Sequence, residues 1–151
     1  MTDHIYTTGL DWSGSTGVGY RAYDRAHTVA INDEVTLSLS ADSAFRGDAR
    51  SANPEQLLLA AASSCQLLSF LAVAALAHVD IVRCTDSARA VMPADSSPMR
   101  ITEVTLDVKI VARGTDEATV RALLQDAHEQ CFIANSLAAP VTITAEVDII
   151  A

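Results

Sequence analysis

One segment limits what this chain can fold into, because residues 57–77, LLLAAASSCQLLSFLAVAALA, contain no charge, proline or glycine. A helix of 21 such residues is long enough to cross a bilayer. Seven of the 21 are alanine, however, and polar residues lie near the middle, while flanking Lys, Arg and aromatic anchors are sparse. We therefore favour a soluble helix that protein surrounds on nearly all sides, and we expect no membrane partner.

The residues just before this segment favour the start of a helix. Asn53 can cap it, Pro54 suits the first helical position, and Glu55 opposes the helix dipole. Gln56 can complete a capping box with Asn53. The sequence therefore predicts one central helix over 53–78.

A single domain of 151 residues with one sheet can hardly cover such a helix on all sides. A second copy of the chain would cover it, which predicts a homodimer, most simply a two-fold one. The net charge of −9, with 19 acidic against 10 basic residues, would repel nucleic acid and anionic lipid. We therefore expect no nucleic-acid partner.

The rest of the chain predicts strands and a second helix around the central one, in a single α+β domain over 1–151. Period-two alternation indicates strands in ITEVTLDVKIVA and VTITAEVDII, and helical spacing with Thr115 as a cap indicates the second helix. Within residues 1–50, DWSGSTGVGYRAY and VTLSLSADS read as short strands joined by turns. The expected elements are N-terminal strands in 1–50, strands in 81–112, a helix over 115–131 and a strand over 141–150.

The chain has three cysteines and no Cys-x-x-Cys pair, so any function they have should be reactive rather than architectural. Cys65 lies in the middle of the central helix; it is either a small apolar residue or a functional thiol among the polar Ser63, Ser64 and Gln66. Cys131 is expected on the inner face at the end of the second helix, where the two thiols could meet. Cys84 is interpreted as packing. The N-terminus has no secretory signal pattern, so we expect a cytoplasmic protein.

Two segments carry a resemblance to a known family. The string NPEQLLLAAASSCQLLSFLA (53–72) and the later AHEQCFIANSLAAPVTI (127–143) resemble the two cysteine segments of the OsmC/Ohr family, the osmotically inducible protein C and organic hydroperoxide resistance proteins. The resemblance implies an α+β fold with antiparallel sheets wrapped around central helices in an intertwined homodimer. It also implies reduction of organic hydroperoxides, with Cys65 as the peroxidatic thiol and Cys131 as the resolving one.

The resemblance further implies an arginine beside the peroxidatic cysteine, oriented by Glu55. Arg46 is the favoured candidate, with Arg21 and Arg25 as alternatives. A guanidinium suits this task because it stays charged when partly buried and offers a fork of donors. Glu55 and Cys65 are about 15 Å apart along one straight helix, at 1.5 Å per residue. We therefore expect packing across the subunit boundary, or a long arginine, to complete the site.

The chemistry implied by the resemblance uses no cofactor and no metal. Attack on the peroxide leaves a sulfenic acid at Cys65, and Cys131 condenses with it to form a disulfide in this scheme of oxidative-stress defence. A dithiol reductant, either a small molecule or a protein, must then close the cycle. Apolar surroundings favour an organic hydroperoxide, because burying an alkyl chain gains about 0.8 kcal/mol per methylene.

Three other functions stay open at this stage. A cysteine hydrolase could use Cys65 as nucleophile with His78 or His128 as base. A metal site could use Cys131, His128 and Cys65 as ligands. A ligand-binding or stress protein of the same fold, without peroxidase turnover, is the strongest rival, because a fold alone does not establish an activity.

Overall fold

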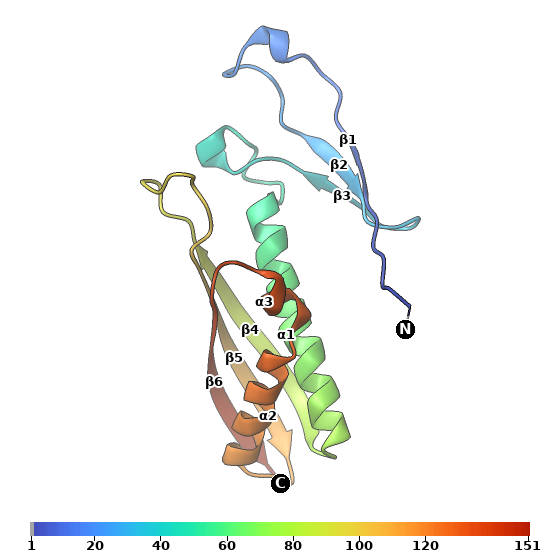
Figure 1. Cartoon of the computed structure of the whole chain (residues 1–151), viewed down its shortest axis with the longest axis vertical. Coiled ribbons are helices and arrows are strands. Elements are labelled where there is room, and N and C mark those ends of the chain that lie inside the picture. Colours follow the sequence, from blue (N-terminus) through green and yellow to red (C-terminus); the bar gives the residue numbers. More distant parts are fainter. Residues whose placement is uncertain (1) are drawn as a thin grey trace. The chain divides into compact units, whose positions relative to one another are not determined.

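The computed structural model describes residues 2–151, which form two compact units (Figure 1). The first unit extends to Leu57 and the second runs from Leu58 to Ala151. The helices and strands together confirm the predicted α+β class.

The N-terminal unit is built on a three-stranded antiparallel sheet in the order β1-β2-β3. Its strands are β1 (Gly9–Asp11), β2 (His27–Ala30) and β3 (Thr36–Leu39). Two short 3-10 turns, η1 (Thr16–Val18) and η2 (Ser43–Phe45), lie in its connections.

The strand expected in DWSGSTGVGYRAY is wrong beyond Asp11, because side chains there bond within a loop instead of forming a ladder. Trp12 Nε1 donates a hydrogen bond to the carbonyl oxygen of Asp24 at 2.9 Å. The Trp12 ring also meets the Tyr23 ring edge-on, with 6.4 Å between the centroids. Ser15 caps η1 within the same stretch.

The central helix α1 (Pro54–Leu76) has a side-chain cap at its start and a left-handed residue just after its end. The Asn53 side chain accepts from the Gln56 backbone N–H at 2.9 Å, and the Gln56 side chain accepts from the Asn53 N–H at 3.1 Å. These two bonds are the expected capping box. Beyond the last turn, His78 adopts the left-handed conformation with φ 58°, which stops the helix.

The C-terminal unit contains a second three-stranded sheet, in the order β4-β5-β6. Strands β4 (Asp80–Val91) and β5 (Glu103–Arg113) pair antiparallel, whereas β5 and β6 (Val141–Ile150) pair parallel. The parallel pair differs from the expected all-antiparallel arrangement. Its cause is the helix between β5 and β6, which returns the chain to the end of the sheet where β5 began.

Two helices fill that connection, α2 (Glu117–Glu129) and the short α3 (Phe132–Ser136). The cap of α2 is Asp116 rather than the expected Thr115: its carboxylate accepts from the Thr119 backbone N–H and hydroxyl, both at 2.9 Å. These donors favour the ionised form and lower the pKa of Asp116.

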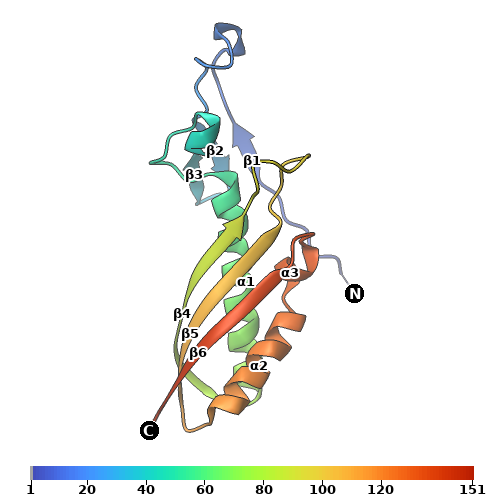
Figure 2. The ribbon, with the colours of Figure 1, turned by 90° about the vertical axis from the view of Figure 1, so that its left-hand side faces the viewer.

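The core of the C-terminal unit lies between the sheet and the helices, with α1 and α2 on the same face of β4-β5-β6 (Figure 2). Alternate residues of β5 supply the floor and are all buried: Val104, Leu106, Val108, Ile110 and Ala112. Helix α2 adds Val120, Leu124 and Ala127, and α1 adds Ala62 and Phe70. The apolar residues of the period-two pattern in β5 therefore face the core.

Much of α1 remains uncovered. By length and composition it could cross a membrane, with a mean hydropathy of 2.0 over an 18-residue window of which 22% is buried. A core helix of a soluble protein passes the same test. Its exposed leucines are Leu67, Leu68, Leu71 and Leu76, of which Leu68 is 63% exposed. An apolar surface of this kind indicates an interaction face.

Candidate active site

The two cysteines singled out by the sequence are neighbours in the C-terminal unit. Cys65 is half-buried on α1, and Cys131 lies between α2 and α3 with 1% of its surface exposed. The backbone N–H of Ile133, in the first turn of α3, donates to the Cys65 sulfur at 3.4 Å. Cys131 lies near enough to Cys65 for the Cys65 side chain to influence its pKa. The arrangement brings together two thiols that are far apart in the sequence.

The environment of Cys131 keeps it protonated. Burial raises the pKa of the Cys131 thiol, and the neighbouring Cys65 side chain raises it further. The backbone N–H groups of Ala134 and Ile133 act in the opposite direction without reversing the shift. Cys131 is therefore a shielded thiol beside a more accessible one.

A polar pair links α1 to α2 one residue beyond Cys65. Gln66 is only 3% exposed, and its Oε1 lies 3.3 Å from His128 Nδ1, which donates in this pairing. The Gln66 Nε2 atom is buried and has no hydrogen-bond partner within residues 2–151. Sequence reasoning noted Gln66 as a polar residue on an apolar helix but did not pair it with His128, because the two are 62 positions apart.

The three candidate arginines lie in the N-terminal unit and have different surroundings. Arg25 is already occupied: it donates at 2.8 Å to the carbonyls of Tyr23 and Tyr20, and its guanidinium lies 3.9 Å above the centre of the Tyr23 ring. Arg21 is exposed. Arg46 is also exposed and follows η2 in the left-handed conformation, with φ 68°.

The predicted pairing of Glu55 with an arginine beside Cys65 is not formed by the contacts within either unit. Glu55 is half-buried in the first turn of α1, and none of the ion pairs found among residues 2–151 includes Glu55 or Arg46. Within residues 58–151 no arginine donates a hydrogen bond to the Cys65 sulfur. The roles of Glu55 and of an arginine stay predictions.

The hydrolase and metal interpretations gain no support from the placed histidines. His78 is exposed just beyond the end of α1, and His128 bonds to Gln66. Across residues 2–151 no group of three or more His, Cys, Asp or Glu side chains is placed to hold a metal ion.

Comparison with protein families gives one match. A family model described as OsmC-like protein matches residues 47–146, a stretch that includes both Cys65 and Cys131. No curated protein matches the chain.

Solved structures with the same fold cover nearly the whole chain. An OsmC-like protein of unknown function from Vibrio cholerae is 26% identical, with a TM-score of 0.85 over 95% of this chain and 100% of that one. An organic hydroperoxide resistance protein from Elizabethkingia anophelis is 21% identical, with a TM-score of 0.71 over 99% and 100% of the two chains. The organic hydroperoxide resistance protein OhrB of Bacillus subtilis is 22% identical, with a TM-score of 0.64 over 95% and 98%.

Proposed function

This chain belongs to the OsmC-like protein family, and from that premise we propose that it is a thiol-dependent peroxidase that reduces organic hydroperoxides to alcohols. One observation carries the proposal. The half-buried Cys65 and the buried Cys131 are neighbours where α1 packs against α3, which suits a disulfide-forming pair.

The proposed cycle has three balanced steps. The Cys65 thiolate attacks the outer oxygen of the hydroperoxide, the O–O bond breaks, and the alkoxide leaves as an alcohol after taking a proton. The Cys131 thiol then attacks the sulfur of the Cys65 sulfenic acid, so that a disulfide forms and water leaves. An external dithiol reduces the disulfide and becomes oxidised in turn.

The Ile133 N–H contributes to the first step in this scheme. This donor holds the Cys65 sulfur beside α3, two residues from Cys131. Because a thiolate is the attacking species, the scheme also calls for a cation near Cys65. We assign that cation to Arg46, oriented by Glu55, with Arg21 as the next candidate; Arg25 is less suited, because the tyrosine carbonyls already hold its guanidinium.

The proposal includes a homodimer built on α1. The exposed leucines of this helix would be costly to leave in water, since burying a leucine side chain gains about 1.5–3 kcal/mol. A two-fold partner would cover them, and we expect packing across the subunit boundary, or a long arginine, to complete the site at Cys65.

The alternative is a ligand-binding protein of the same fold without turnover, which an apolar cavity beside the cysteines favours. Turnover distinguishes the two functions. The reduced protein, mixed with cumene hydroperoxide and excess dithiothreitol, should consume the peroxide catalytically, as followed by ferrous oxidation. Cys65→Ser should reduce consumption to the uncatalysed background, and the matched Cys84→Ser control should retain it. Background rates from the unmodified protein would reject the peroxidase and leave the binding protein.

A further inference from the structure

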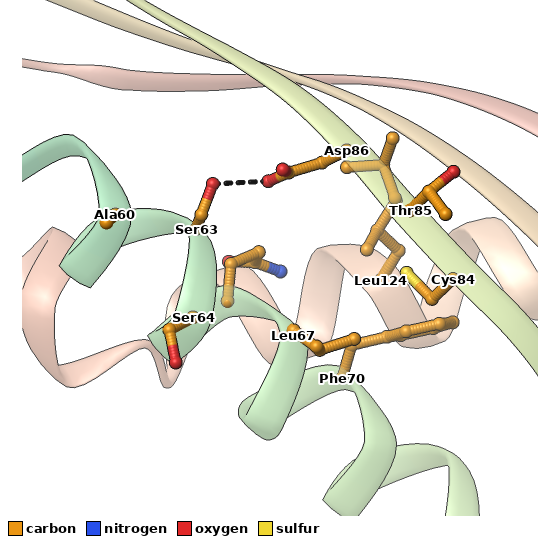
Figure 3. Close-up of a pocket in the computed structure, with 11 residues that line it drawn as sticks. Ala60, Ser63, Ser64, Leu67, Phe70, Cys84, Thr85, Asp86 and Leu124 are labelled. Atoms are coloured by element: carbon orange, nitrogen blue, oxygen red, sulfur yellow. Dashed lines mark hydrogen bonds between the residues drawn. The ribbon is translucent and has the colours of Figure 1, made fainter. Parts of the chain in front are cut away.

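A cavity of about 370 Å³ opens between α1 and β4, within the C-terminal unit (Figure 3). Its volume lies within the range of about 300–1,000 Å³ that is usual for small-molecule sites. Ser64 and Gln66, the neighbours of Cys65 along α1, help to line it, whereas the Cys65 sulfur itself receives the Ile133 N–H of α3. The cavity is therefore adjacent to the cysteine pair without containing the contact between the thiols.

The interior of the cavity is apolar. Leu67 and Phe70 of α1 line it together with Val108 of β5 and Leu124 of α2. The Cys84 side chain extends from β4 toward Phe70 and Leu67 (Figure 3). Burial, and then the charge of Asp86, raise the pKa of the Cys84 thiol, so this sulfur stays neutral and adds to the apolar wall.

One polar group inside the cavity lacks a partner. The Oε1 atom of Gln66 takes the His128 hydrogen bond, which leaves the two N–H donors of its buried Nε2 unpaired within residues 2–151. A buried donor without an acceptor costs stability, because it has lost its hydrogen bonds to water. Because Gln66 lines the cavity, an acceptor on a bound molecule would remove that cost.

A carboxylate in the lining restricts the charge of such a molecule. Asp86 lies on β4 and accepts a hydrogen bond from the Ser63 hydroxyl at 2.5 Å, and both residues line the cavity (Figure 3). The net charge of the chain is −9. Both features oppose an anionic ligand such as a fatty carboxylate.

We propose that this cavity is a second binding site, separate from the cysteine pair, for a neutral aliphatic molecule with a single carbonyl group. The hydrocarbon part packs against Leu67, Phe70 and the neighbouring apolar walls. The carbonyl oxygen accepts from Gln66 Nε2. Binding at this site needs no peroxidase turnover, so it can be tested independently of the reaction at Cys65.

The cavity contains a thiol that can report its occupancy. In a Cys65→Ser/Cys131→Ser protein, Cys84 is the one remaining cysteine. We expect 2-nonanone to slow the reaction of Cys84 with N-ethylmaleimide in a saturable manner, and nonanoate to require at least tenfold higher concentration. Absence of protection by 2-nonanone, or equal protection by nonanoate, would overturn the proposal.

A matched substitution tests the hydrogen bond. Gln66→Leu in the same background keeps the side chain's approximate size and removes the donor, and it should weaken 2-nonanone binding about tenfold. Unchanged affinity in a folded Gln66→Leu protein would reject the assigned donor. If that variant fails to fold, Cys84→Phe decides instead: a phenyl ring that fills the cavity should abolish the calorimetric binding of 2-nonanone, and retained binding would place the ketone elsewhere.

Discussion

At the scale of single residues, the two cysteines of the pair differ in accessibility. Cys65 is half-buried, whereas Cys131 is 1% exposed and has a raised pKa. A dissolved peroxide therefore meets Cys65 first. A protonated, shielded Cys131 resists direct oxidation, because thiolates rather than thiols react with peroxides. This difference supports the order of attack in the proposed cycle.

The raised pKa of Cys131 predicts how the alkylation of this thiol depends on pH. In a Cys65→Ser/Cys84→Ser protein the first substitution also removes the influence of the Cys65 thiol, which leaves burial as the main cause of the raised pKa. Thiolate forms only as pH rises through that raised pKa, so alkylation of Cys131 by iodoacetamide should reach half its maximal rate at higher pH than in the urea-unfolded protein. Coincident pH profiles for the folded and unfolded protein would contradict the burial of this thiol.

The sequence could predict part of this site and not the rest. The polar residues around Cys65 and the helical spacing of Cys131 are local patterns, and both pointed to the pair. The Ile133 N–H and the pairing of Gln66 with His128 depend on how α1, α2 and α3 pack, which spacing along the chain does not encode. One signal was available for the cavity: Asp86 alternates with Cys84 and Ala88 on the inward face of β4, where a charge is unexpected.

At the scale of elements, the start of α1 depends on the reciprocal bonds between Asn53 and Gln56. Asn53 is 8% exposed, and its amide also donates to Asp42 at 3.4 Å. The cap therefore ties the helix to the loop that follows β3.

Removal of this cap should be measurable. Asn53→Ala loses the acceptor for the Gln56 N–H and should lower the free energy of unfolding by about 1 kcal/mol, as urea denaturation would show. Asn53→Ser keeps a side-chain oxygen that can cap the helix, adds no charge beside Asp42, and serves as the matched control. Equal stability of Asn53→Ala and the unmodified protein would contradict a stabilising role of this cap at the start of α1.

Elements with strong periodicity were predicted, and those held by loop contacts were not. The expected helix over 53–78 corresponds to α1, and the alternating segments correspond to β5 and β6. The parallel pairing of β6 was missed because alternation determines which face a residue occupies and not the direction of its neighbour. The 3-10 turn near Trp12 was missed because ring contacts hold that loop.

At the scale of the whole molecule, the exposed leucines of α1 are the surface that we propose to form a dimer interface. Leu68 is 63% exposed and Leu71 is 39% exposed on a helix without charges between residues 57 and 77. We expect a homodimer in sedimentation velocity. Leu68→Asp should dissociate it, because a buried unpaired carboxylate at the interface is costly.

A matched control separates loss of the dimer interface from a general loss of stability. Ala122→Asp places the same carboxylate on the exposed face of α2 and should leave the dimer intact. A monomer in the unmodified protein at micromolar concentration, or a dimer that survives Leu68→Asp, would contradict the proposed role of α1.

The sequence alone could not single out one arginine as the proposed activating cation. Arg46, Arg21 and Arg25 all belong to the N-terminal unit, and no local pattern says which of them reaches a cysteine in the C-terminal unit or in a partner. That choice depends on assembly rather than on spacing.

The most direct test of the peroxidase account is a single-turnover titration. Reduced protein treated with one equivalent of cumene hydroperoxide, in the absence of any dithiol, should lose two thiols per chain. Peptide mass spectrometry should then find Cys65 linked to Cys131, with Cys84 still free. Unchanged thiols, or a peroxide-dependent link that involves Cys84 instead, would contradict the account.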